Sequence, residues 1–197
     1  MKKVLLLASW IIASFFGQIG ALFAGAAFYL GAMQRVAPEA LSGPSSLAPP
    51  PIGYVLNATA ALLGGAILGV LQYGVLRSFR FFATPMWILA TAAGFAIPMI
   101  ALYTTPPSSF FTGDALLLIQ GVLVGLLQWL LLRRRFPRDY LWIPAAAAGS
   151  LVLFTSALRV PQILWLLLTP ALTGILLVAW VFPPVSQSAT LNSRADR

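Results

Sequence analysis

Apolar residues run through most of this chain in long, nearly uninterrupted segments. A helix needs about 20 mostly apolar residues to cross the hydrocarbon core of a bilayer. Six segments meet that requirement: residues 4–33, 52–76, 85–103, 114–132, 140–158 and 161–182. The pattern therefore predicts an all-α integral membrane helical bundle with six transmembrane helices over residues 1–182, followed by a polar tail over 183–197.

The first segment, residues 4–33, follows Lys2 and Lys3 and resembles the start of a signal peptide. Its apolar run is longer than the roughly 7–15 apolar residues of such a peptide, so we interpret it as a retained helix. At about 1.5 Å per residue it is also longer than the bilayer core. We expect this helix to tilt, or to project past the bilayer on one side.

Composition agrees with a surface covered by lipid. The chain is 60% hydrophobic and only 8% charged, whereas soluble domains carry roughly a quarter charged residues. The formal charge of +8 is therefore better explained by membrane topology and anionic headgroups than by nucleic acid, which we do not expect as a partner.

Basic residues are distributed unequally between the two sides of the predicted bundle. With the N-terminus inside, ten of the twelve Lys and Arg residues lie in the cytoplasm, and only Arg35 and Arg159 lie outside. Short cytoplasmic loops of membrane proteins are enriched in Lys and Arg. We therefore predict a multi-pass protein of the bacterial inner (cytoplasmic) membrane, with both termini and the tail over 183–197 in the cytoplasm.

Two stretches of the chain repeat one another. Residues 65–77 read GAILGVLQYGVLR and residues 121–133 read GVLVGLLQWLLLR, so both fit G-x-x-x-G-x-x-Q-aromatic-x-x-L-R. Beyond a short basic loop, Trp87-Ile88 corresponds to Trp142-Ile143, and an Ala-Ala-Gly triplet follows in both copies. We interpret helices 2–3 and 4–5 as a parallel tandem hairpin repeat about a pseudo-two-fold axis along the membrane normal. The first and last segments show no clear counterpart and are interpreted as flanking helices.

The repeated motif places small and polar residues on one face of a helix, because positions i, i+4 and i+7 lie above one another. The candidate helix-packing residues are Gly65, Gly69, Gln72, Gly121, Gly125 and Gln128. In lipid, helices associate through close contact at small residues and through interhelical hydrogen bonds. We predict that the second and fourth helices cross at these faces, with Gln72 and Gln128 close together.

Aromatic and basic residues flank the predicted cytoplasmic ends of both hairpins. They are Tyr73, Trp87, Trp129, Trp142, Arg77 and Arg133. Trp and Tyr are enriched at the headgroup level of membranes, so we interpret this set as interface anchors. The alternative is that the aromatic rings stack on a pigment or another ligand.

The hairpin motif, G-x-x-x-G-x-x-Q-W-x-x-L-R…W-I, resembles that of a set of uncharacterised bacterial multi-pass membrane proteins, which often carry it twice. The resemblance covers about residues 64–150, and the chain departs from the pattern at Tyr73, where Trp is usual. It implies the membrane topology and supplies no activity.

The side chains present exclude several kinds of chemistry. The chain has no Cys and no His, which removes disulfides, thiolate nucleophiles, Cys/His zinc sites and imidazole acid–base catalysis. No ionisable residue falls inside a predicted membrane core, although buried carboxylates are typical of proton-coupled transporters. We therefore expect no enzyme activity, no catalytic residues and no metal site.

These exclusions favour a non-catalytic accessory or scaffold subunit of a larger membrane protein complex. Its partners would be membrane lipids and other integral membrane subunits, and its helices could hold lipid, carotenoid or quinone between them. The alternative is a small-solute transporter or substrate-binding subunit, because the six-helix layout is similar to the substrate-binding subunits of energy-coupling-factor vitamin transporters. In that reading, Gln and Trp side chains would bind a neutral or aromatic solute.

Overall fold

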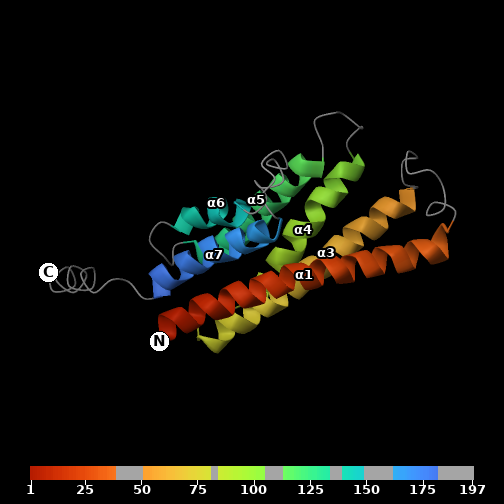
Figure 1. Cartoon of the computed structure of the whole chain (residues 1–197). Helices are drawn as coiled ribbons and strands as arrows, with labels where there is room; N and C mark the ends of the chain where they lie inside the picture. The colour runs from red at the N-terminus through yellow and green to blue at the C-terminus, as the bar shows by residue number, and fades with distance from the viewer. Residues whose placement is uncertain (39–50, 81–83, 105–112, 134–138, 149–161, 182–197) are drawn as a thin grey trace, which may run out of the picture.

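All the regular secondary structure in the described part of the chain is helical (Figure 1). The structure is a computed structural model that describes residues 1–38, 51–80, 84–104, 113–133, 139–148 and 162–181. The elements are α1 (Lys2–Val36), α3 (Pro51–Ser78), α4 (Met86–Thr104), α5 (Gly113–Leu132), the 3₁₀ turn η1 (Asp139–Leu141), α6 (Trp142–Ala147) and α7 (Gln162–Val181).

These helices occupy the segments that the hydrophobic pattern indicates. α1 has 35 residues, which at about 1.5 Å per residue makes it longer than the roughly 30 Å core of a bilayer. Of the fifth segment, residues 140–158, only 140–148 are described, so about half of the helix predicted there lies outside the described residues, as does the tail over 183–197.

The helices form a closed ring. Each one contacts the next along the chain, from α1 through α3, α4, α5 and α6 to α7, and α7 contacts α1. Successive helices run in alternating directions, so the N-terminus lies at the same end of the bundle as the C-terminal ends of α3 and α7 (Figure 1). The first and last helices are therefore neighbours, although they are farthest apart in the sequence.

Among the described residues, two helices are long and apolar enough to cross a membrane, α1 and the part of α3 from Ile52 to Ser78. Large apolar side chains cover their outer faces; Leu22 and Phe23 of α1, for example, are 70% and 69% exposed. Shorter apolar helical stretches are Met86–Ala101, Leu118–Leu132 and Leu167–Trp180. The outer surface of the described bundle is thus apolar on several helices.

Close contacts at small residues bring the first two helices together. A Cβ atom on Gly64 would lie 3.0 Å from the Ala21 carbonyl oxygen, and one on Gly25 would lie 3.2 Å from the Ala60 carbonyl oxygen. Any larger side chain at these positions would force the two backbones apart. The long pairing of α1 with α3 therefore depends on glycine and alanine along the contact.

Candidate functional site: a core of tryptophan and glutamine

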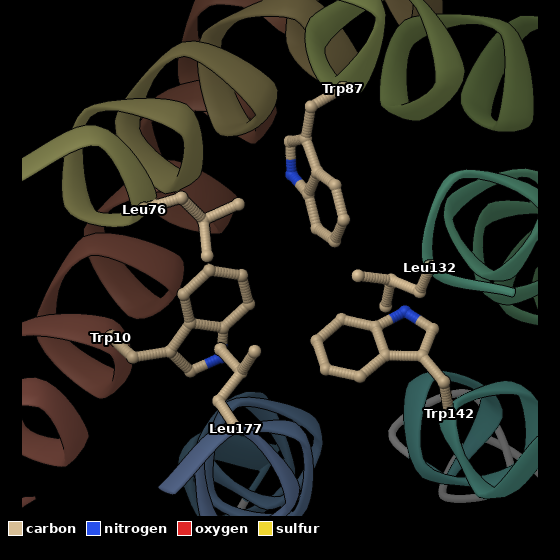
Figure 2. Packing of buried hydrophobic residues seen from close by; sticks show 6 residues of the cluster. All are labelled: Trp10, Leu76, Trp87, Leu132, Trp142 and Leu177. Carbon is tan, nitrogen blue, oxygen red and sulfur yellow. The ribbon is translucent and has the colours of Figure 1, made fainter. Parts of the chain in front are cut away.

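Three tryptophans meet at the centre of the ring, near the end that carries the N-terminus. Figure 2 shows Trp10, Trp87 and Trp142, from α1, α4 and α6, pointing toward one another. Their ring centroids are 6.2 Å, 5.9 Å and 5.7 Å apart, with interplanar angles of 75°, 65° and 73°. Each ring therefore makes edge-to-face contacts with the other two, which is a favoured geometry for aromatic pairs.

Three leucines complete this core, one from each of the remaining helices (Figure 2). Leu76 of α3, Leu132 of α5 and Leu177 of α7 are all fully buried. The six residues fill the centre of the ring at this level. We call them the central cluster.

Each indole N–H of the central cluster donates a hydrogen bond to a polar side chain of a neighbouring helix. Trp87 Nε1 donates to Gln72 Oε1 at 3.1 Å, and Trp142 Nε1 donates to Gln128 Oε1 at 3.0 Å. Trp10 Nε1 donates to Thr173 Oγ1 at 2.9 Å. Because a buried donor without an acceptor is costly, these bonds hold each ring in a defined orientation.

The two glutamines also bond to each other and to hydroxyl groups across the ring. Gln128 Nε2 donates to Gln72 Oε1 at 3.2 Å and to Thr91 Oγ1 at 2.9 Å. Gln72 Nε2 donates to Ser14 Oγ at 3.1 Å. All four side chains are at most 7% exposed. They form one buried polar network that joins α1, α3, α4 and α5, and that reaches α6 through Trp142.

The structure brings together the two glutamines that the motif places on equivalent helix faces, but it separates the glycines. A Cβ on Gly69 would lie 2.9 Å from Ile88 Cα, and one on Gly65 would lie 2.8 Å from Ala92 Cα, so both glycines pack on α4. The corresponding atom on Gly125 would lie 3.1 Å from Ile143 Cα of α6. The predicted crossing of α3 and α5 at their glycines is therefore wrong, because each glycine face packs on the partner helix of its own hairpin. Gly121 is buried.

The interpretation of the tryptophans as interface anchors is corrected for two of them. Trp87 and Trp142 are 2% and 0% exposed and lie in the central cluster, where their N–H groups find glutamine acceptors. Tyr73 and Trp129 are half-buried and pack against that cluster. Arg77 and Arg133 are exposed at the ends of α3 and α5.

Sequence reasoning missed several residues of the core. These are Trp10, Ser14, Thr91, Thr173 and Leu177. The leucine of each motif copy, Leu76 and Leu132, lies eleven residues after the first glycine, on the same helix face as the glycines and the glutamine, and both are fully buried. Trp10 could have been found, because Trp10-Ile11 repeats the Trp-Ile pair of the two hairpins.

The network is neutral, and its members are paired with one another. Within the described residues, no cluster of three or more His, Cys, Asp or Glu side chains could hold a metal ion. Two buried polar atoms, Gln18 Oε1 and Trp129 Nε1, have no hydrogen-bond partner there. The arrangement therefore fixes helices and ring planes, and it offers hydrogen bonds but no general acid or base.

Comparison with known proteins adds no relatives. No protein-family model, no curated protein and no solved structure matches the chain.

Proposed function

We propose that this chain is a six-helix membrane protein that acts as a non-catalytic scaffold or accessory subunit of a larger membrane complex. It would lie in the bacterial inner membrane with both termini in the cytoplasm. The observation that supports this proposal most directly is the buried polar network. Its polar groups join helices to one another, and its members are Gln72, Gln128, Ser14 and Thr91.

The apolar outer surface supports insertion of more helices than α1 and α3 alone. Exposed large apolar residues continue onto α4 at Leu89, onto α5 at Leu130 and onto α7 at Ile175, which are 59%, 40% and 54% exposed. Soluble monomers rarely expose apolar area that continues over several elements. Polar side chains, by contrast, gather at the centre of the bundle, as membrane helix packing favours.

The position of the charges supports the proposed orientation. Lys2, Lys3, Arg77 and Arg133 stand at helix ends on the side of the bundle that carries the central cluster. Cytoplasmic ends of membrane helices retain such basic residues and contact anionic headgroups. This end would accordingly face the cytoplasm.

Equivalent contacts in the two hairpins support a tandem duplication. Gly69 packs on Ile88 as Gly125 packs on Ile143, and Trp87 bonds to Gln72 as Trp142 bonds to Gln128. Each hairpin is thus held by a close backbone contact and one indole–amide hydrogen bond. A unit of this kind needs only to pack, which suits a scaffold.

The glutamine pairing counts against a solute site built on the same residues. A solute held by Gln72 or Gln128 would have to replace bonds that each amide already makes to indole, hydroxyl and amide partners. Leaving those buried partners unpaired costs about 1–3 kcal/mol for each group. The amides are therefore better suited to fixing the helices than to exchanging a ligand.

An apolar tail has a place on the opposite half of the bundle. A groove of about 290 Å³ lies between α3 and α4. Its lining residues are Tyr54, Val55, Ala58, Thr59, Leu62, Ala96 and Ile100. The groove suits an acyl or isoprenoid chain, and through it the scaffold could retain lipid, quinone or carotenoid.

Native mass spectrometry of the tagged full chain, released from its own membranes in mild detergent, tests the proposal. We expect a stoichiometric assembly with larger integral membrane subunits and a retained apolar small molecule. Recovery of the chain alone, with bulk lipid only, would contradict the scaffold role. A melting-temperature shift of the isolated chain with a vitamin-like solute would instead identify a solute-binding subunit.

A further inference from the structure

The first helix carries the same pattern as the second helix of each hairpin. Residues 10–17, 87–94 and 142–149 all read W-I-x-A-x-x-x-G. In the structure, Trp10, Trp87 and Trp142 occupy equivalent places around the central cluster. The residues two positions after each tryptophan, Ile12, Leu89 and Pro144, are all exposed. The three helices therefore share a burial pattern as well as a sequence pattern.

The last helix corresponds in the same way to the first helix of each hairpin. Thr173 accepts the indole N–H of Trp10, as Gln72 and Gln128 accept those of Trp87 and Trp142. Four residues later, Leu177 joins Leu76 and Leu132 in the central cluster. The residues two positions after Thr173, Gln72 and Gln128 are all exposed; they are Ile175, Gly74 and Leu130.

A further contact recurs where one pair of helices meets the next. A Cβ on Gly17 of α1 would lie 3.1 Å from Leu68 Cα of α3, and one on Gly94 of α4 would lie 2.7 Å from Val124 Cα of α5. Gly17 and Gly94 both end the W-I-x-A-x-x-x-G pattern, and Leu68 and Val124 both precede their glutamine by four residues. We call the boundary between one pair of helices and the next a seam. The α1–α3 and α4–α5 seams therefore share the same close glycine contact.

We propose that α7 and α1 form a third unit equivalent to α3–α4 and α5–α6, and that the ring of three units parts at the seam between α6 and α7 to admit lipid. The pseudo-symmetry is then three-fold, with the third unit made from the two ends of the chain. The idea rests on the membrane location proposed above.

Within the described residues, the α6–α7 seam lacks a contact that the other two seams have, namely a hydrogen bond from a glutamine amide to a hydroxyl group, which we call the amide lock. At the α1–α3 seam Gln72 donates to Ser14, and at the α4–α5 seam Gln128 donates to Thr91. The equivalent pair at the α6–α7 seam is Thr173 and Ala146. Ala146 has no polar side-chain atom, and the Thr173 hydroxyl donates to the Thr169 carbonyl of its own helix.

In the described part of the α6–α7 seam, two aromatic rings are in contact. The rings of Trp142 and Trp180 lie 5.8 Å apart at an interplanar angle of 31°. Lipid tails are as apolar as the side chains that they replace, so apolar contacts between helices compete poorly with lipid, whereas hydrogen bonds have no counterpart in the acyl region. The seam without the amide lock is accordingly the one that lipid can separate.

Spin labels at equivalent exposed positions test this directly, because the chain has no cysteine of its own. The cysteine pairs are Ile12→Cys with Gly74→Cys, Leu89→Cys with Leu130→Cys, and Pro144→Cys with Ile175→Cys. In lipid nanodiscs, pulsed electron paramagnetic resonance should give one narrow distance for the first two pairs and a broad or two-population distribution for the third.

Two double variants, one that adds the amide lock and one that removes it, provide the matched controls. Thr173→Gln with Ala146→Ser adds the amide lock at the α6–α7 seam and should narrow the distance distribution of the third label pair. Gln72→Thr with Ser14→Ala removes the amide lock from the α1–α3 seam and should broaden the distance distribution of the first label pair. If this variant does not fold, the variant that adds the lock at the α6–α7 seam still tests the proposal. A third distribution as narrow as the other two, or unchanged by the installed lock, would overturn the proposal. Absence from the membrane fraction would instead contradict the proposed function, whatever the distances show.

Discussion

Gln128 shows how much of the structure one uncharged side chain can organise. Its two N–H groups reach Gln72 on α3 and Thr91 on α4, and its carbonyl oxygen accepts from Trp142 on α6. A carboxylate at this position could accept hydrogen bonds but could not donate them to Gln72 and Thr91. The amide is therefore the group that satisfies neighbours of both kinds without burying a charge.

At this scale, the sequence predicted the meeting of Gln72 and Gln128 but not the positions of the tryptophans. Spacing places a glutamine on the small-residue face of a helix, and a polar group on that face has few other partners. A tryptophan near a helix end, by contrast, fits a headgroup belt and a packed core equally well. Only the three-dimensional arrangement shows Trp87 and Trp142 turned inward.

Removing one indole N–H should reveal the strength of its hydrogen bond. We expect Trp142→Phe to lower the free energy of unfolding by about 1–2 kcal/mol, from the lost bond to Gln128 and a small loss of packing. Trp129→Phe is the control: Trp129 Nε1 is buried with no partner among the described residues, so its removal breaks no hydrogen bond and should cost clearly less than Trp142→Phe. Unfolding in mixed detergent–SDS micelles, followed by circular dichroism, measures both. Equal losses would show that the indole bond contributes nothing specific.

At the scale of helices, the pattern predicted where close packing occurs but not between which helices. Glycines four apart mark a face that a second backbone can approach, and this holds for any partner. The partner of Gly69 is Ile88 of α4, the helix that follows α3 along the chain. A helix joined by a short connection is the readier partner, because closing a short loop costs less entropy.

Two glycines of the same helix make this packing testable. A Cβ on Gly69 would lie 2.9 Å from Ile88 Cα, whereas one on Gly74 would meet nothing within 4 Å. We expect Gly69→Ala to destabilise the bundle by about 1–3 kcal/mol, since the two backbones must move apart. Gly74→Ala should be neutral or stabilising by up to about 1 kcal/mol, because alanine favours the helix. Similar effects in the same unfolding assay would contradict the tight α3–α4 contact.

At the scale of the whole molecule, hydropathy predicted an all-helical chain, but it could not predict ring closure. Closure depends on contacts between residues at opposite ends of the sequence, such as Trp10 with Thr173, and no local pattern records them. Thr173 also differs in type from the glutamines that it corresponds to, so a search for repeated letters does not find it. The equivalence becomes visible only once hydrogen-bond partners are compared.

The last prediction concerns how the whole ring is oriented. Gln34 near the end of α1 and Ser78 at the end of α3 are both exposed, and they lie at opposite ends of the bundle. Because basic residues gather at the end that carries Ser78, the positive-inside rule places that end in the cytoplasm. In intact bacterial spheroplasts, a membrane-impermeant maleimide should therefore label Gln34→Cys. It should label Ser78→Cys only after the membrane is opened, and no native cysteine interferes. The reverse pattern would contradict the orientation, while labelling of both sites in intact cells would contradict a single crossing of the bilayer between them.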